Sequence, residues 1–292
     1  MSAASSAPGS DSRPGSLGGP DAAGANAPVA PVAASAPGRA VPAVSPPLEI
    51  VQPPSDTPVK EVLDQLRAAA DLGNPQAACR VALEMRRCGH WFELSREPSD
   101  SPLYVAFAPM LRAGKALCAG VDENDVRNNA WRYLWQAAEA GNVAAMTEFA
   151  ITPVVDGFDN PAASADAWLH YRDHAREFLT TAVNDGDVEA AYWGVAFMGT
   201  GNSFGGRGVF KADPYTALVW AEAILPFLDP QRQQNRQYWI DQLEPKLPPD
   251  RVLQAQQDAI ALRARMAAAG ATRVHWPAGN DGPTNPAVDC NK

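Results

Sequence analysis

The chain has 292 residues, of which 46% are hydrophobic, and its formal net charge is −9 at neutral pH. Residues 1–57 contribute two Arg against four Asp and Glu, so the remainder is acidic too, and no basic stripe interrupts it. Binding to the phosphate backbone of a nucleic acid needs a positively charged surface, so this composition argues against a nucleic-acid-binding protein.

The first predicted element is a leader, residues 1–57, without a folded core. It holds 11 of the 27 prolines, is rich in Ala, Ser and Gly, and has no aromatic residue. Such a segment cannot bury enough apolar surface to offset the entropy lost on ordering, so we expect it to be disordered. It contains no apolar run, and the sequence therefore predicts neither a signal peptide nor a membrane-spanning segment there.

Three stretches downstream share one spacing of small and bulky residues that ends in Gly followed by Asn or Asp. The three endings are Gly73-Asn74, Gly141-Asn142 and Gly186-Asp187. Spacings of three and four residues place the side chains of each stretch on one stripe of a helix. Gly suits the left-handed residue that ends a helix, and Asn or Asp can cap the next one. The repeated unit is therefore predicted to be two helices joined by a tight turn.

The same spacing predicts paired helices between residues 58 and 270. In chain order they are 58–72 and 75–88, a pair that starts at residue 123, a pair at 162–185 and 188–198, a pair that starts near residue 213 and ends with 232–243, and a terminal helix at 251–268. The apolar side chains of the terminal helix should cover the open end of the stack: Leu253, Ile260, Leu262 and Met266. Residues 271–292 are expected to be a flexible tail. We expect an all-α fold, an α/α solenoid of about four helix-turn-helix repeats with a C-terminal capping helix.

Residues 89–122 form an insertion in this pattern. The first two repeat glycines are 68 residues apart (141 − 73), whereas the second and third are 45 apart (186 − 141). The insertion is too apolar for a free loop, so part of it should pack on the helices. Trp91 and Phe92 within it, and Arg207 further on, lie outside the repeat pattern and are candidates for contact with a partner.

Three runs of the chain resemble Sel-one-like repeats, which are relatives of the tetratricopeptide repeats. They are LRAAADLGN at residues 66–74, LWQAAEAGN at 134–142, and the segment from Gly199 through a glycine-rich loop to the helix around Trp220. The first unit has Gln65 where the family has an aromatic residue, as an atypical end unit would. The likeness spans roughly residues 58–245. It implies stacked helix pairs that recognise another protein or peptide, with no catalytic residue, metal or cofactor.

The four cysteines leave the pairing open. Cys79 and Cys88 are nine residues apart, so on one helix they face opposite sides about 13.5 Å apart, beyond disulfide reach. Cys88 and Cys118 flank the insertion, and a bridge between them would contribute about 3.7 kcal/mol on the chain-entropy model. The alternative is four unpaired thiols, with Cys79 as a small core residue. Cys290 is expected to be free in the tail. The resemblance favours the bridge, because some bacterial Sel-one-like proteins cross-link their helices with disulfides.

The compartment follows from the leader only indirectly. Without a signal peptide the literal interpretation is cytoplasmic. An Ala-, Pro- and Ser-rich leader, however, resembles the spacer that follows an export signal or membrane anchor in envelope proteins. Together with the candidate bridge, it favours a periplasmic location with the signal or anchor missing from this sequence.

The spacing of the His residues and of the glycine-rich loop gives little support for a catalytic site. His170 and His174 stand four apart on a predicted helix, as metal ligands can, but zinc-protease chemistry would need Glu where Tyr171 stands. Both histidines fall on the opening turns of a repeat helix, so we expect a solvated face there and no metal. The loop at 199–208 lacks the preceding strand and the Lys-Ser/Thr ending of a phosphate-binding loop, and it is interpreted as an inter-repeat turn.

We therefore expect a non-enzymatic adaptor that binds another protein or peptide in the bacterial cell envelope. The alternatives are a metal- or thiol-dependent hydrolase that uses His170 and His174 or Cys88, and a purely structural envelope spacer.

Overall fold

A computed structural model of the chain describes residues 50–152, 161–200, 209–271 and 289–291. Regular secondary structure in these ranges is helical throughout, without a strand, which confirms the all-α prediction. Arg207, residues 1–49 of the predicted leader and residues 272–288 of the predicted tail lie outside the described residues.

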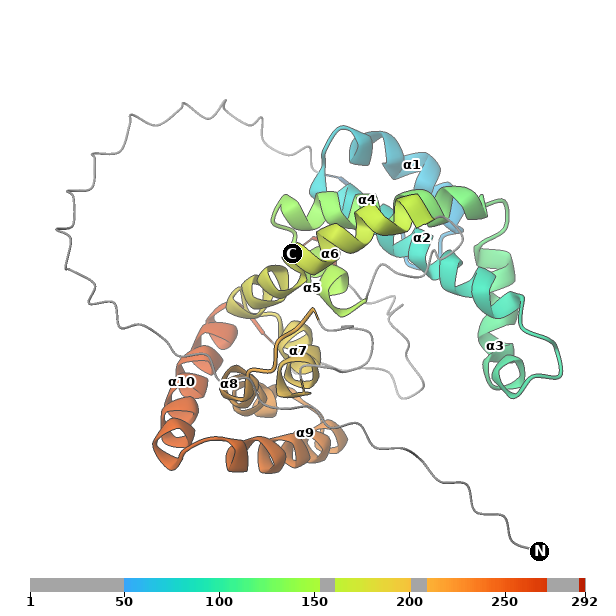
Figure 1. The fold of residues 1–292 in the computed structure, drawn as a ribbon. Helices are drawn as coiled ribbons and strands as arrows, with labels where there is room; N and C mark the ends of the chain where they lie inside the picture. The colour runs from blue at the N-terminus through green and yellow to red at the C-terminus, as the bar shows by residue number, and fades with distance from the viewer. Residues whose placement is uncertain (1–49, 153–160, 201–208, 272–288, 292) are drawn as a thin grey trace, which may run out of the picture. The chain divides into compact units, whose positions relative to one another are not determined.

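Figure 1 shows the helices in chain order. They are α1 (Val59–Asp71), α2 (Pro75–Ser95), α3 (Pro102–Leu117), α4 (Glu123–Glu139), α5 (Val143–Ile151), α6 (Pro161–Asn184), α7 (Val188–Thr200), α8 (Pro214–Ile224), α9 (Pro230–Leu243) and α10 (Pro249–Ala268). Short 3-10 helices, η1 (Leu225–Phe227) and η2 (Glu244–Lys246), follow α8 and α9. The predicted boundaries agree within two residues except at the end of α2.

The three Gly-Asn and Gly-Asp steps lie between paired helices, as predicted. Their glycines have backbone angles that side chains rarely adopt, with φ of 92° at Gly73, 91° at Gly141 and 96° at Gly186. In each turn the next residue accepts a hydrogen bond at 2.9 Å from the N–H three residues further on: Asn74, Asn142 and Asp187. Each turn therefore ends one helix and caps the next.

The helices pack with their partners and with the next pair. Within pairs, α1 contacts α2, α4 contacts α5, α6 contacts α7 and α8 contacts α9. Between pairs, the second helix of one packs on the first helix of the next: α2 on α4, α5 on α6 and α7 on α8. Buried apolar side chains form one cluster that runs from α1 to α10. The described helices thus share a continuous core.

Helix α10 packs on α8, but with a different face from the predicted one. Leu262 and Met266 are buried as expected, whereas Leu253 and Ile260 are 62% and 63% exposed. Leu253 lies nine residues before Leu262, which is two and a half turns, so the two side chains point to opposite sides of the helix. Small residues, Ala255 and Ala259 among them, complete the buried face instead.

The predicted insertion is helical and extends the first pair. Helix α2 continues to Ser95, beyond the predicted end at Cys88, and α3 packs on it. The contact is close because Gly114 has no side chain: a Cβ there would lie 2.2 Å from Cδ1 of Trp91. The expectation that part of residues 89–122 packs on the helices is confirmed.

Candidate functional site

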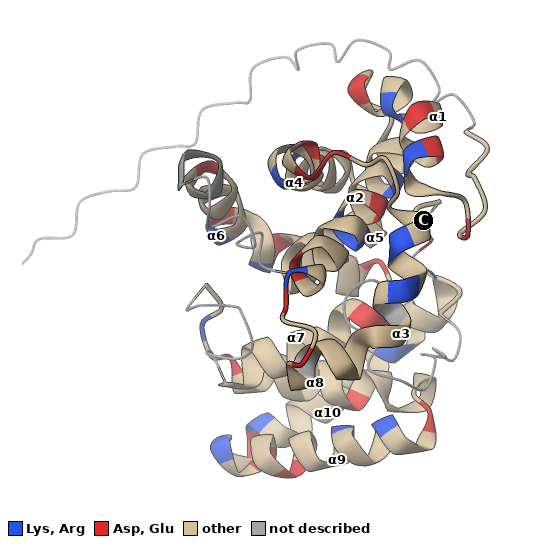
Figure 2. Cartoon of the chain, turned by 90° about the vertical axis from the view of Figure 1, so that its right-hand side faces the viewer, with Lys and Arg blue, Asp and Glu red and all other residues tan. Residues whose placement is uncertain are grey.

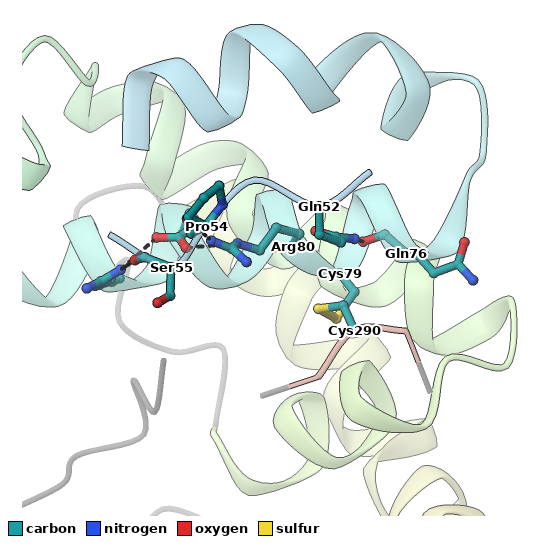
Figure 3. Close-up of polar contacts among 9 residues, drawn as sticks. Gln52, Pro54, Ser55, Gln76, Cys79, Arg80 and Cys290 are labelled. Carbon is teal, nitrogen blue, oxygen red and sulfur yellow. Dashed lines mark hydrogen bonds and ion pairs between the residues drawn. A yellow bond between two sulfur atoms is a disulfide. The ribbon is translucent and has the colours of Figure 1, made fainter. Parts of the chain in front are cut away.

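Residues 50–56, which we call the N-terminal segment, lie along α2 (Figure 3). Gln52 donates its side-chain N–H to the carbonyl of Gln76 at 3.2 Å. Pro54 and Ser55 in turn offer their main-chain carbonyls to two arginine side chains of α2, each at 3.1 Å. Pro53 is buried. Residues 50–56, which the sequence assigned to the leader, therefore have contacts with α2. Their amino-acid composition did not indicate these contacts, because the groups involved are mostly main-chain carbonyls.

The two arginines, Arg80 and Arg87, are positioned by one carboxylate. Glu84 lies between them on the same face of α2, accepts from Arg80 Nε at 2.9 Å and from Arg87 Nη1 at 3.2 Å, and is only 5% exposed. Two guanidinium groups share one carboxylate, so donors remain for the N-terminal segment. We call these three residues the Arg80–Glu84–Arg87 cluster. Its two arginines contact main-chain carbonyls and not side chains of the N-terminal segment, at a turn in which the N–H of Thr57 donates to the carbonyl of Pro54 at 3.2 Å.

A second segment, residues 289–291, reaches α2 from the other end of the chain. Cys290 forms a disulfide with Cys79 and is 4% exposed, and its carbonyl accepts a hydrogen bond from Asn142 Nδ2 at 2.8 Å. Figure 3 shows the disulfide close to Gln52 and Arg80. The expectation that Cys290 is free is wrong. Cys79 is a core residue, but a bonded one. A separation of 211 residues carries no sequence signal that such a pair will meet.

The other two cysteines, Cys88 and Cys118, form a disulfide with a Cα–Cα distance of 5.5 Å. This is the bridge that the sequence favoured at the ends of the insertion. All four cysteines are consequently paired. The thiol that a Cys88-dependent hydrolase would need is absent from this structure.

The candidate partner-contact residues Trp91 and Phe92 are half-buried and contact other parts of the chain. Trp91 donates its ring N–H to the carbonyl of Leu111 at 3.0 Å, and Phe92 packs edge-on against it with ring centroids 5.1 Å apart. Both side chains are half-buried against the core. Their contacts explain the packing of α3 on α2. The third candidate, Arg207, lies outside the described residues.

His170 and His174 do not form a simple solvated face. Both imidazole rings pack against the ring of Trp135 from α4, with centroid distances of 4.4 Å for His170 and 4.7 Å for His174. Each has one nearby carboxylate, Asp166 at 3.7 Å and Glu177 at 3.8 Å. In the described part of the chain, no group of three or more His, Cys, Asp and Glu could hold a metal ion. The two histidines contribute to the contact between α4 and α6.

Two buried charges were not identified from the sequence. Glu148 on α5 is 2% exposed and pairs with Arg86 of α2 at 3.0 Å, and its burial raises the pKa of its carboxyl. Arg236 on α9 is 2% exposed, donates to the carbonyl of Tyr192 at 2.9 Å, and lies 4.3 Å from the centre of that ring. Its Nε and Nη1 have no hydrogen-bond partner among the described residues. Burial lowers the pKa of Arg236 to about 10.

The charges on the surface are mixed. Figure 2 shows both Lys and Arg and Asp and Glu distributed over the helices. None of the helices in the described ranges is long and apolar enough to cross a membrane. The docked terminal segments on α2 are thus the most specific feature that the structure offers.

The chain was also compared with known proteins. No family model matches the chain, and no match was found among curated proteins or solved structures.

Proposed function

We propose that this chain is a non-enzymatic scaffold that binds another protein or peptide on an α/α solenoid of about four helix-turn-helix units. The repeated turns and the packing of each second helix on the next first helix support the solenoid. So does the resemblance to Sel-one-like repeats at residues 66–74 and 134–142. In this proposal α10 is the cap that closes the last unit.

One observation carries the binding role: α2 already binds a short non-helical segment of its own chain, which ends in a turn at residues 54–57. Arg80 and Arg87 of the Arg80–Glu84–Arg87 cluster contact main-chain carbonyls of the N-terminal segment, and Pro53 in that segment is buried. Hydrogen bonds to a peptide's main chain give affinity that does not depend on its side chains. We infer that the partner presents a short, proline-containing segment with free main-chain carbonyls to the same face of α2.

We propose a periplasmic location. Four cysteines in two disulfides support an oxidising compartment, since disulfides are rare where glutathione and thioredoxin keep thiols reduced. A pairing that joins residues 79 and 290 also ties the C-terminal end of the chain to the first pair of helices.

A pull-down from envelope extract tests the scaffold role with three baits: the full chain, the chain that begins at residue 58, and the latter with Arg80→Ala and Arg87→Ala. We expect one protein at a stoichiometric ratio, with recovery higher when the N-terminal segment is absent and lost again with the double substitution. Circular dichroism of each bait controls for folding. Recovery of no stoichiometric partner by any bait would favour the spacer alternative and refute the scaffold.

A further inference from the structure

Helix α10 carries a second apolar face besides the one that packs on α8. Leu253 and Ile260 are 62% and 63% exposed, and they lie seven residues apart, so they stand two turns apart on one side of the helix. Gln257 lies between them and Ala264 lies one turn beyond Ile260 on the same side, and both are exposed. We call these four residues the α10 seam. It contains no charged side chain.

The α10 seam has no neighbour among the described residues that covers it. The opposite side of α10 is already buried, with Leu262 and Met266 2% and 0% exposed, and α10 packs there on α8. A surface helix of a globular protein normally has one apolar stripe, which faces its core, and polar side chains on the other side. Large aliphatic residues that recur every seven positions on a second side are the pattern by which two helices pair.

The residues of the α10 seam are complementary to the same residues in reversed order. When two copies of α10 lie antiparallel with Gln257 opposite Gln257, Leu253 of each copy faces Ile260 of the other, because these residues lie four before and three after Gln257. A carboxamide has both donors and an acceptor, so the two Gln257 side chains can satisfy each other across a two-fold axis. One polar residue in an otherwise apolar seam fixes the register of paired helices.

The charges beside the α10 seam fit the same arrangement. Asp250 and Arg265 are exposed on one flank of the helix, seven residues before and eight residues after Gln257. At the rise of an α-helix they lie about 10.5 and 12 Å from Gln257 along the axis, in opposite directions. Reversal of one copy therefore brings Asp250 of each beside Arg265 of the other, which gives two ion pairs. A parallel pair would keep like charges level with each other.

We propose that the α10 seam binds the α10 seam of a second copy of this chain, antiparallel and about a two-fold axis at Gln257. An isologous contact uses the same patch on both copies, so the assembly closes at the dimer. The contact consists of one pair of helices, so the interface is small and the dissociation constant should be on the order of 100 μM. This inference goes beyond the proposed function and does not depend on it.

Sedimentation velocity of the full chain, at concentrations from about 10 μM to about 1 mM, measures the dimer. Leu253→Gln together with Ile260→Gln should raise the dissociation constant at least tenfold, whereas Leu72→Gln, at a position that is 87% exposed on the C-terminal end of α1, should leave it unchanged. Asp250→Arg alone and Arg265→Asp alone should each raise it at least threefold, and the two together should restore the dimer. Circular dichroism confirms that each variant is folded.

Single cysteines test the register, because the four native cysteines are paired. Gln257→Cys lies on the proposed axis and should link to itself under a mild oxidant, as identified by the linked peptide in the mass spectrum. Leu253→Cys in one copy lies about 12 Å along the axis from Leu253→Cys in the other, so it should link to itself at least threefold more slowly. A mixture of Leu253→Cys and Ile260→Cys should link faster than either variant alone.

A monomer at every concentration overturns the proposal. So does a dimer that the Leu253→Gln and Ile260→Gln pair does not weaken, or one that the exchanged charges at Asp250 and Arg265 do not restore. Linkage of Leu253→Cys to itself as fast as that of Gln257→Cys would indicate a parallel pair or chance collision, and it overturns the antiparallel arrangement.

Discussion

Replacement of the buried Arg236 by Met should stabilise the protein. Arg236 is still protonated at neutral pH, because burial lowers its pKa only to about 10. This fall below the ordinary pKa of Arg corresponds to about 3 kcal/mol by which folding penalises the charge. The guanidinium also keeps two nitrogens without a partner among the described residues. Breaking its contacts with Tyr192 costs part of the gain, about 1–2 kcal/mol for the hydrogen bond and the ring together.

The net expectation for Arg236→Met is a rise of about 1–2 kcal/mol in the free energy of unfolding, since Met preserves most of the volume. Urea unfolding followed by circular dichroism at neutral pH measures it. Arg232→Met is the matched control on the same helix, because Arg232 pairs with Asp229 near the surface and should change stability by less than about 1 kcal/mol.

The pH dependence has a definite sign. The folded-state pKa of Arg236 lies below its unfolded value, so the penalty is fully present below about pH 10 and is relieved as the pH rises further. The stability advantage of Arg236→Met should consequently shrink above that pH. A loss of more than 1 kcal/mol in the variant at neutral pH would show that the guanidinium is satisfied, and would refute the reasoning.

Three other variants test the packing. Cys88→Ser together with Cys118→Ser opens a loop of 31 residues and should lower the unfolding free energy by up to about 3.7 kcal/mol in urea; a change below 1 kcal/mol would contradict this. Gly114→Ala should cost about 1–3 kcal/mol, because its Cβ would lie 2.2 Å from Trp91, and an unchanged melting temperature would be inconsistent with the α2–α3 contact. Burial raises the pKa of Glu148, so the folded state binds that proton more tightly than the unfolded state. The wild type should therefore gain stability relative to Glu148→Gln between pH 7 and pH 5, and a gain for the variant would reverse the assignment.

The helix pairs were predictable because their signals are local. Gly73 and the adjacent Asn74 predict the end of one helix and the cap of the next. The structure shows a φ of 92° at Gly73 and a capping hydrogen bond to the side chain of Asn74. The end of α2 was missed for the opposite reason. Gly89 directly after Cys88 is a typical helix-ending residue, but α2 continues through it and packs against α3, which lies outside any local window.

The features on α2 could be predicted only in part. Cys88 and Cys118 flank one insertion, so chain order alone suggested that they are close. Cys79 and Cys290 meet only because the chain returns across the whole fold, and nothing near either residue indicates it. The N-terminal segment was assigned to the leader on composition, although its carbonyls find donors on α2. Acceptors on a main chain are common to every residue and therefore leave no mark in a sequence.

Binding of a peptide to α2 is the central claim, and fluorescence anisotropy tests it most directly. A labelled peptide of residues 46–57 is titrated with the chain that begins at residue 58, and with the same chain carrying Arg80→Ala and Arg87→Ala, after circular dichroism has shown that both are folded. We expect saturable binding that the double substitution weakens at least tenfold. No binding, or equal binding by both chains, would contradict the assignment of α2 as a peptide-binding surface.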